Sequence, residues 1–292
     1  MFPSQYFNLF PPFPRDNKVF VAMSFQSVFE KRWESAIAPA IKRVERNNVP
    51  LEPFRVDIRH ISDSILTEIL TGISRSLLIF ADVSSLGRID GKPMRNGNVM
   101  YEVGLAHAIR LPEEVILFRS DNDDLLFDVA NVRVNKYDPD NDPKKAIKMI
   151  GTTIVEAIKE IDLKKHLSVN AAAESLDFPC WDILLQTAMN GEIEPPPIKT
   201  MGQALGNARR ISAISRLLEL GALKTDYIQI TPEMLVEMQQ DQPGEKMVKY
   251  QLTQFGRALI EHIGSEMGIS SPEIKKSIEK YLGLSGEASS KK

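Results

Sequence analysis

The sequence predicts an α/β protein in which a doubly wound parallel sheet is followed by a C-terminal winged helix. The first supporting observation is that short, nearly continuous apolar runs alternate with helical patterns through the first half. This alternation is typical of parallel strands that are covered on both faces. The second observation is a change of pattern in the second half, where helices on either side of a proline run at 195–197 precede a hairpin and a further helix.

Length and composition place few limits on function. The chain has 292 residues, which is enough for two domains with separate cores. A net charge of -3 indicates no class of partner, and the single cysteine, Cys180, excludes an internal disulfide. Because the sequence has no cluster of cysteine and histidine, it predicts no structural zinc, and neither a metal nor a cofactor is expected.

Residues 1–14 are rich in aromatic side chains and proline. The segment lacks the basic start and the unbroken apolar core of a signal peptide. We therefore expect an extended arm that packs on its own domain or on a neighbour. No stretch of the chain approaches the roughly 18 apolar residues of a membrane span, so we expect a cytoplasmic protein without membrane contact.

Strands and helices alternate from residue 15 to residue 163, the bounds of the first predicted domain. The predicted strands are 18–25, 55–61, 77–84, 114–119 and 128–137. The predicted helices are 30–46, 62–74, one that begins near Asn98, and 143–161. A polar loop is expected from 85 to 97. This alternation predicts that the strands are parallel and that helices cover both faces of the sheet.

Polar side chains follow the ends of these predicted strands. In a parallel sheet the carboxyl ends meet at one edge, where doubly wound proteins bind their ligands. The candidates at this edge are Ser24, Phe25, Asp63, Asp82, Ser84, Asn98 and Glu102. The absence of GxGxxG after the first strand and of GxxxxGK[ST] argues against a Rossmann dinucleotide site and a P-loop. The acids suit the hydroxyls of a ribose, with one carboxylate left for chemistry at the anomeric carbon.

The stretch from Asn96 to Arg110 carries the acid best placed for that chemistry. Two asparagines flank Gly97 and predict a turn that runs into a helix near Asn98, with Glu102 close to the first turn. An acid at this place can simply complement the positive end of the helix dipole. The other acids expected at the same sheet edge favour a functional interpretation of Glu102.

Residues 18–161 resemble the nucleoside 2-deoxyribosyltransferase superfamily and the related Toll/interleukin-1 receptor-like predicted nucleotide-binding proteins of bacteria. The matching segments are 19–25, 63–74, 79–84 and above all 98–107, NVMYEVGLAH. The resemblance implies a flavodoxin-like, deoxyribosyltransferase-like sheet, and it makes Glu102 the carboxylate that acts at the anomeric carbon. It also implies that Asp82 helps to hold the sugar. The transferases usually carry an Asp and a Gly-Thr before this helix, whereas Asn-Gly-Asn-Val stands here, nearer the receptor-like branch.

The expected activity is cleavage of the N-glycosidic bond of a nucleoside, nucleotide or NAD-like ligand, or deoxyribosyl transfer, in bacterial defence or nucleotide signalling. Glu102 is the expected catalytic residue, and Asp82 and Asn98 are expected to orient ribose hydroxyls. Two neighbouring acids should also raise the pKa of one of them, which leaves a proton for the departing base. The remaining residues expected to line the pocket are Ser24, Phe25, Asp63 and Ser84. The alternative is a winged-helix transcription regulator that senses nucleotides without catalysis.

The second half predicts a linker at 164–176, a winged helix at 177–264 and, at 265–292, a C-terminal helix with a flexible tail. Segments 215–223 and 250–257 resemble the recognition helix and the wing of winged-helix regulators. From 178 to 264, eight basic residues and ten acidic residues give a net charge of -2, unlike the basic surface of a DNA-binding domain. We therefore expect self-association or docking to a protein. DNA binding is disfavoured, although the predicted recognition helix gathers three basic residues, Arg209, Arg210 and Arg216.

Overall fold

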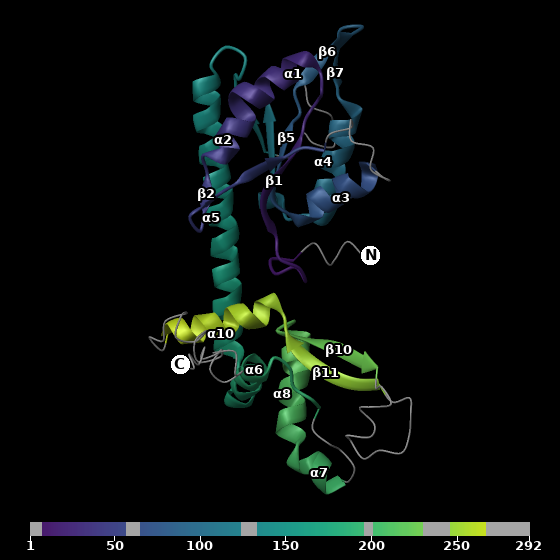
Figure 1. Cartoon of the computed structure of the whole chain (residues 1–292), viewed down its shortest axis with the longest axis vertical. Helices are drawn as coiled ribbons and strands as arrows, with labels where there is room; N and C mark the ends of the chain where they lie inside the picture. The colour runs from purple at the N-terminus through teal and green to yellow at the C-terminus, as the bar shows by residue number, and fades with distance from the viewer. Residues whose placement is uncertain (1–7, 57–64, 124–132, 196–200, 230–245, 267–292) are drawn as a thin grey trace, which may run out of the picture. The chain divides into compact units, whose positions relative to one another are not determined.

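A five-stranded parallel sheet occupies the centre of the N-terminal half (Figure 1). The computed structural model describes residues 8–56, 65–123, 133–195, 201–229 and 246–266. The strands of the sheet are β1 (Asp16–Ala22), β4 (Glu52–Phe54), β5 (Ser76–Asp82), β8 (Val115–Arg119) and β9 (Val134–Lys136). They lie in the order β4-β1-β5-β8-β9, and each neighbouring pair is parallel. Counted along the chain this is the order 2-1-3-4-5 of flavodoxin-like sheets, which confirms the predicted parallel α/β sheet.

Helices cover both faces of this sheet. Every residue of β5 is buried, and its side chains alternate between two hydrophobic cores: Leu78 and Phe80 belong to one, Ile79 and Ala81 to the other. The first core is completed by α1 (Ser27–Arg32), the π-helical segment η2 (Trp33–Ile37), α2 (Ala38–Lys42) and α5 (Pro143–Ser175). The second core is completed by α3 (Ile65–Arg75) and α4 (Gly97–Ile109).

The edge strand β4 lies earlier in the chain than the sequence pattern indicates. The predicted strand at 55–61 starts where β4 ends, and its residues 57–61 lie outside the described part. β4 pairs with β1 so that Phe54 is opposite Phe20 and Pro53 is opposite Val19. Pro53 is the central residue of β4, and a proline is compatible with an edge strand because one side of the strand needs no ladder hydrogen bonds.

The segment between β5 and α4 is a β-hairpin, not the polar loop expected at 85–97. Its strands β6 (Ser85–Ile89) and β7 (Lys92–Arg95) pair in antiparallel fashion. Two short strands, β2 (Glu45–Arg46) and β3 (Val49–Pro50), pair in antiparallel fashion and form a second, smaller hairpin after α2. In the larger hairpin, Asp90 and Gly91 form the turn with φ angles of 49° and 75°, and Asp-Gly is a common pair in such turns.

Two compact units divide the chain, Met1–Lys165 and His166–Lys292. Helix α5 continues to Ser175, well beyond the helix expected at 143–161. The segment expected to be a linker at 164–176 is therefore helical up to its penultimate residue, which its alanines favour because alanine has the highest helix propensity. Neither α5 nor any other helix among the described residues combines the length and the hydrophobicity that a membrane span requires.

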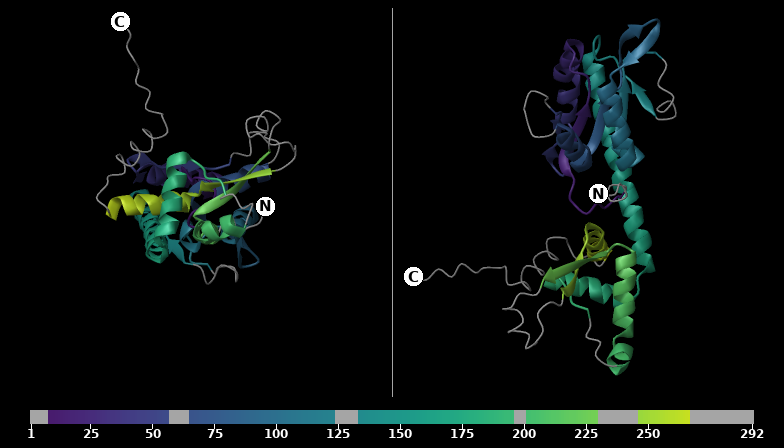
Figure 2. Two further views of the ribbon diagram at one scale, coloured as in Figure 1. Left: turned by 90° about the horizontal axis from the view of Figure 1, so that it is seen from below. Right: turned by 90° about the vertical axis from the view of Figure 1, so that its right-hand side faces the viewer.

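The described part of the second unit combines helices with one hairpin (Figure 2). Its elements are α6 (Phe178–Asn190), α7 (Met201–Gly206), α8 (Ala208–Glu219), β10 (Leu223–Gln229), β11 (Lys246–Leu252) and α10 (Gln254–Glu266). The strands β10 and β11 pair in antiparallel fashion, and a single bridge joins Ile193 to Tyr250 of β11. Helices α6 and α8 pack against each other and bury Cys180 and Leu217. The expected C-terminal helix and tail lie outside the described residues, apart from the end of α10.

The described part of the N-terminal arm, residues 8–14, packs on its own unit. The guanidinium groups of Arg15 and Arg75 lie over the ring of Phe13, at 5.6 and 5.4 Å from its centre. The ammonium group of Lys165 lies over the ring of Phe10 at 5.7 Å. Cations above aromatic faces stabilise such contacts, so Phe10 and Phe13 hold this described part of the arm.

Candidate functional site

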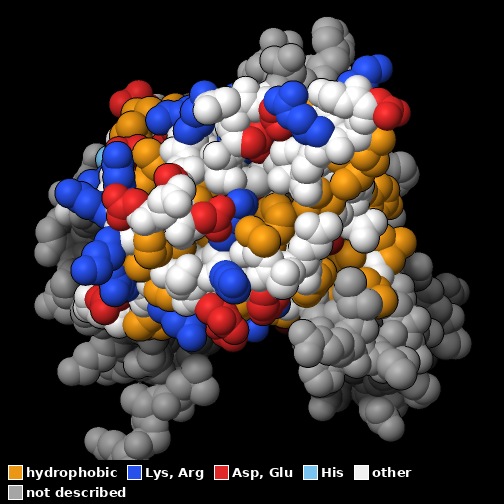
Figure 3. All heavy atoms as spheres, turned by 90° about the horizontal axis from the view of Figure 1, so that it is seen from above, with side chains coloured by type: hydrophobic (Ala, Val, Ile, Leu, Met, Phe, Trp, Pro, Cys, Tyr) orange, Lys and Arg blue, Asp and Glu red, His pale blue; other side chains and the backbone are white. Residues whose placement is uncertain are grey.

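The carboxyl ends of the parallel strands meet at one edge of the sheet, at the top of Figure 1, where the hairpin β6–β7 also lies. Doubly wound sheets bind ligands at this edge, and the predicted site residues follow these strands. Figure 3 views the molecule from above and shows acidic and basic side chains next to one another, with hydrophobic side chains between them. This face is therefore mixed in charge.

Asp82 ends β5 with a buried carboxylate whose oxygens are engaged within the protein. Its Oδ1 accepts hydrogen bonds from the backbone N–H and the hydroxyl of Ser84, at 3.0 and 2.5 Å. Its Oδ2 accepts from the hydroxyl of Tyr137 at 2.7 Å and from Nη1 of Arg32 at 3.3 Å. A carboxylate offers about four acceptor positions. Asp82 therefore cannot accept a hydrogen bond from a sugar unless one of these internal bonds is given up.

Arg32 links Asp82 to the segment that follows β9. Its Nε and Nη2 donate to the two carboxylate oxygens of Asp140, at 2.9 and 2.5 Å. Burial opposes the charged form of Arg32, but the hydrogen bond to Asp140 and the charge of Asp82 outweigh it and raise the pKa of Arg32. Burial, together with the charge of Asp82, also raises the pKa of Tyr137. Arg32 therefore stays charged and Tyr137 stays neutral at physiological pH.

The hydroxyls of Ser84 and Ser24 are buried and bonded to nearby groups. The Ser84 hydroxyl accepts hydrogen bonds from the backbone N–H and the hydroxyl of Ser120, at 2.9 and 3.1 Å. This contact joins the end of β5 to the end of β8. The Ser24 hydroxyl accepts from the backbone N–H of Gln26 at 3.3 Å. Both serines are 2% exposed, so they shape the edge and do not present a hydroxyl to solvent.

Phe25 presents an apolar ring to solvent just after β1, with 42% of the residue exposed. The guanidinium of Arg55 lies over this ring at 4.6 Å and over the ring of Trp33 at 4.8 Å. Arg55 also donates through Nη2 to the carboxylate of Glu30 at 2.9 Å. These contacts place the residues that follow β1 and β4 side by side. Asp63, the other residue predicted near this end of the sheet, lies outside the described residues.

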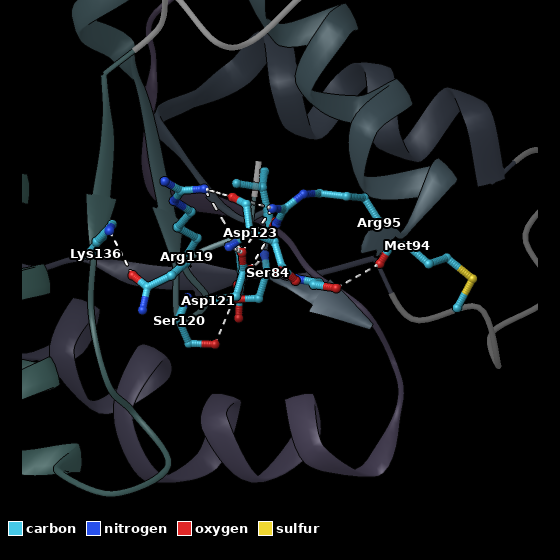
Figure 4. Close-up of polar contacts among 12 residues, drawn as sticks. Ser84, Met94, Arg95, Arg119, Ser120, Asp121, Asp123 and Lys136 are labelled. Atoms are coloured by element: carbon cyan, nitrogen blue, oxygen red, sulfur yellow. Dashed lines mark hydrogen bonds and ion pairs between the residues drawn. The ribbon is translucent and has the colours of Figure 1, made fainter. Parts of the chain in front are cut away.

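A second polar network, drawn in Figure 4, ties the hairpin β6–β7 to the end of β8. Arg95 donates two hydrogen bonds to Asp121, Nη1 to Oδ2 and Nη2 to Oδ1, both at 2.9 Å. Asp121 also accepts from the backbone N–H of Ser85 at 2.7 Å, and Arg95 also donates to the carbonyl of Val83. Burial acts to raise the pKa of Asp121, but the hydrogen bonds from Arg95 and Ser85 outweigh it and lower that pKa. Asp121 is therefore ionised at neutral pH.

Helix α4 begins immediately after this hairpin. Asn96 is its N-cap, because the side-chain oxygen of Asn96 accepts hydrogen bonds from the N–H groups of Asn98 and Val99 at 2.9 and 3.3 Å. The helix starts at Gly97, close to the expected position. Asn98 is exposed, and Glu102 lies four residues later on the same side of the helix. These two predicted residues therefore share one face of α4.

Glu102 is partly buried, and no ion pair or hydrogen bond joins it to another described residue. Val99, Val103 and Ala106 of the same helix are buried in the core against the sheet, which keeps Glu102 near apolar groups. Burial raises the pKa of Glu102 from 4.5 to about 7. The sequence argument expected a neighbouring acid to raise a pKa in this site, but burial is the cause in the structure.

A pocket of about 260 Å³ opens at the same edge beside β8 and β9. It is lined by Ser120, Asp121, Asn122, Lys136, Tyr137, Asp138, Asp142, Lys145, Ala146 and Met149. None of the predicted site residues lines this pocket, although Ser120 and Tyr137 in its wall hold Ser84 and Asp82. Within the described residues, no three histidine, cysteine or acidic side chains gather as ligands for a metal ion.

The residues that fix the predicted acids were missed at the level of sequence. Tyr137 directly follows β9 and Asp121 lies two residues after the end of β8, so the convergence of strand ends was a signal that could have found them. Arg32 lies in a predicted helix, 50 residues before Asp82. Arg95 lies in the segment expected to be a loop. No local pattern marks either arginine, because their partners come from distant parts of the chain.

Comparisons with known proteins leave the family of this chain open. No protein-family model matches the chain, and no curated protein matches it. Among solved structures, the chain is similar to the metal-soaked Flv1 flavodiiron core from Synechocystis sp. PCC6803, with 14% identity and a TM-score of 0.34. The similarity covers 50% of this chain and 36% of that one. A likeness at this TM-score carries no argument, so the fold assignment rests on the strand order.

Proposed function

We propose that the first unit binds a nucleoside, nucleotide or NAD-like ligand at the carboxyl edge of the sheet and cleaves its N-glycosidic bond, with Glu102 as the catalytic carboxylate. The observation that carries the proposal is the partly buried carboxyl of Glu102 and its raised pKa. Burial raises its pKa to about 7, and no other described residue pairs with it. An ionised carboxylate in such surroundings lowers stability, and acids with perturbed pKa values are concentrated at functional sites.

The proposed reaction breaks the bond between the anomeric carbon of the sugar and a nitrogen of the base. The base leaves with the electron pair, and positive charge develops on the sugar. Ionised Glu102 stabilises this charge while water attacks the anomeric carbon, or Glu102 itself attacks that carbon and forms an ester that water then hydrolyses. The departing base takes its proton from water. A pKa near 7 leaves part of Glu102 ionised at neutral pH, and this is the form that both roles need.

The other predicted residues receive different roles in this proposal. Asn98 is exposed one helix turn before Glu102 and offers an amide to the ribose hydroxyls. Phe25 offers an exposed ring to the apolar part of the ligand. The carboxylate of Asp82 already accepts four internal hydrogen bonds. We therefore assign Asp82 to the support of the edge and not to contact with the sugar.

The test is base release by the purified protein. The protein is incubated with a panel of deoxynucleosides, nucleotides and NAD, and free base is followed by chromatography. The Glu102→Gln variant should lose release by at least about 100-fold, as expected when a catalytic group is removed. Glu34→Gln, which changes an exposed acid in the same unit, is the matched control and should keep it. Release that persists in Glu102→Gln would remove Glu102 from this role, and binding without release by the wild type would make the unit a sensor.

We also propose that the second unit is a winged helix that docks to protein. The order of its elements along the chain supports this. Helix α6 is followed by the bridge residue Ile193, then by α7, α8 and the hairpin, and Ile193 pairs with β11. Two arginines of α8 have partners within the unit: Arg210 donates to Gln186 at 3.0 Å, and Arg216 lies 3.5 Å from Asp177. These contacts favour protein docking or self-association over DNA binding, because they compete with contacts to phosphates.

Light scattering and a DNA mobility assay on the whole protein separate these possibilities. An oligomer that does not shift duplex DNA is the expected result. A monomer that binds duplex DNA with a steep salt dependence would favour the nucleotide-sensing transcription regulator instead.

A further inference from the structure

The start of α4, which carries Asn98 and Glu102, is tied to the sheet through the last residue of the hairpin. Arg95 ends β7 and precedes the N-cap residue Asn96. Its side chain is only 3% exposed. Because a single residue separates Arg95 from the helix, any displacement of Arg95 also moves the first turn of α4.

The guanidinium of Arg95 reaches the ends of two strands. It donates to the carbonyl of Val83, directly after β5, and both of its Nη atoms donate to Asp121, after β8, at 2.9 Å each. Figure 4 shows the side chain of Arg95 reaching toward Asp121. Paired bonds between an arginine and a carboxylate fix orientation as well as distance. A lysine carries the same charge but cannot reproduce the planar pair.

Asp121 also binds the first residue of the hairpin. The backbone N–H of Ser85, the first residue of β6, donates to Asp121 at 2.7 Å, and the backbone N–H of Asp123 donates to it at 3.0 Å. Both the entry and the exit of the hairpin are therefore bonded to one carboxylate. The hairpin cannot hinge at either base without the loss of a bond to Asp121.

We propose that Arg95, through its paired contact with Asp121, is a positioning residue for Glu102, an inference that rests on the proposed function. The pair holds the first turns of α4 against the sheet edge, so that the carboxylate of Glu102 stays in a fixed place relative to the bound sugar. Catalytic groups tolerate little displacement, and a shift of about 1 Å costs on the order of 100-fold in rate. Arg95 acts through the helix start and not on the sugar.

The experiment compares Arg95→Gln and Arg95→Lys with the control Arg88→Gln in the full chain. Arg88 is another hairpin arginine paired with an acid, Asp123, but its side chain is 60% exposed. Two measurements are made. The first gives kcat and KM for base release from the nucleoside that the wild type cleaves. The second is the titration midpoint of the Glu102 carboxyl by carbon-13 NMR, with the signal assigned from its loss in Glu102→Gln.

We expect kcat to fall about 100-fold in Arg95→Gln, with KM changed less than about threefold because the substrate contacts remain. Arg95→Lys should be intermediate. The titration midpoint of Glu102 should fall in both variants, since a looser helix start admits water, and Arg88→Gln should change neither quantity. A folded Arg95→Gln variant with wild-type kcat and an unchanged midpoint overturns the proposal.

If Arg95→Gln does not fold, Arg95→Lys decides by the same two measurements. If the wild type releases no base from any compound, the proposed function fails, and the titration alone then decides the positioning role. A lowered midpoint in the Arg95 variants supports that role, and an unchanged midpoint refutes it.

Discussion

Replacing Glu102 by glutamine should make the first unit more stable at alkaline pH. The folded state raises the pKa of Glu102 from 4.5 to about 7, so the folded protein holds this proton more tightly than the unfolded chain. The stabilising effect is fully present below pH 4.5 and is lost as the pH rises through 7. At about 1.4 kcal/mol per pKa unit, ionised Glu102 lowers the free energy of unfolding by up to about 3 kcal/mol. Glutamine has nearly the same shape and carries no charge.

Urea denaturation between pH 4.5 and pH 8.5 measures this effect. The fluorescence of Trp33 reports on the first unit when Trp181 of the second unit is replaced by phenylalanine. The gain in Glu102→Gln should grow with pH to about 3 kcal/mol and should approach zero at pH 4.5. The exposed-site control Glu34→Gln should stay within about 0.5 kcal/mol of the parent at each pH. A gain in Glu102→Gln that does not vary with pH would refute the assignment of a raised pKa to this residue.

Three further substitutions test packing and hydrogen bonding in the two units. Thermal unfolding and urea denaturation measure the change in the free energy of unfolding for each variant. Gly256→Ala should destabilise the second unit by about 3 kcal/mol, because an added Cβ would collide with the carbonyl oxygen of Ala222; a smaller cost would show that the backbone there can move. Gly104→Ala meets no atom within 4 Å and should stabilise α4 by about 0.5–1 kcal/mol. Tyr137→Phe should cost about 2 kcal/mol, since the buried Asp82 loses a donor, and a neutral result would contradict the network.

The fold was predictable from the sequence where the residues of one strand are enough to identify it as a strand. The apolar run that became β5 is buried on both faces, and only a central parallel strand needs such a run. The strand β4 was misplaced because three residues with a central proline do not form a strand pattern. Its position depends on pairing with β1, and no residue pattern within β4 itself indicates that pairing. The Asp90-Gly91 pair is a recognisable turn signal, but the polar residues of β6 and β7 do not form a strand pattern, so the hairpin was not predicted.

The candidate site was predictable in the same partial way. The sequence predicted a helix start near Asn98 with Glu102 close to the first turn, and α4 begins at Gly97, because the turn and N-cap residues that mark a helix start are local signals. The role of Asp82 was not predictable, since it depends on Arg32 and Tyr137, which lie 50 and 55 residues away in the chain. The pKa of Glu102 also depends on tertiary burial, which no motif contains.

The carboxylate of Asp82, which accepts four internal hydrogen bonds, and that of Glu102, which pairs with no other described residue, should experience different selection. Replacement of Asp82 by a residue without a carboxylate leaves the donors of three other residues with too few acceptors, a cost that does not depend on whether the protein is active. Replacement of Glu102 removes a charge that lowers stability, so only use of that charge opposes its loss. Related chains that bind without reacting should therefore keep an acid at position 82 and drift to neutral residues at position 102.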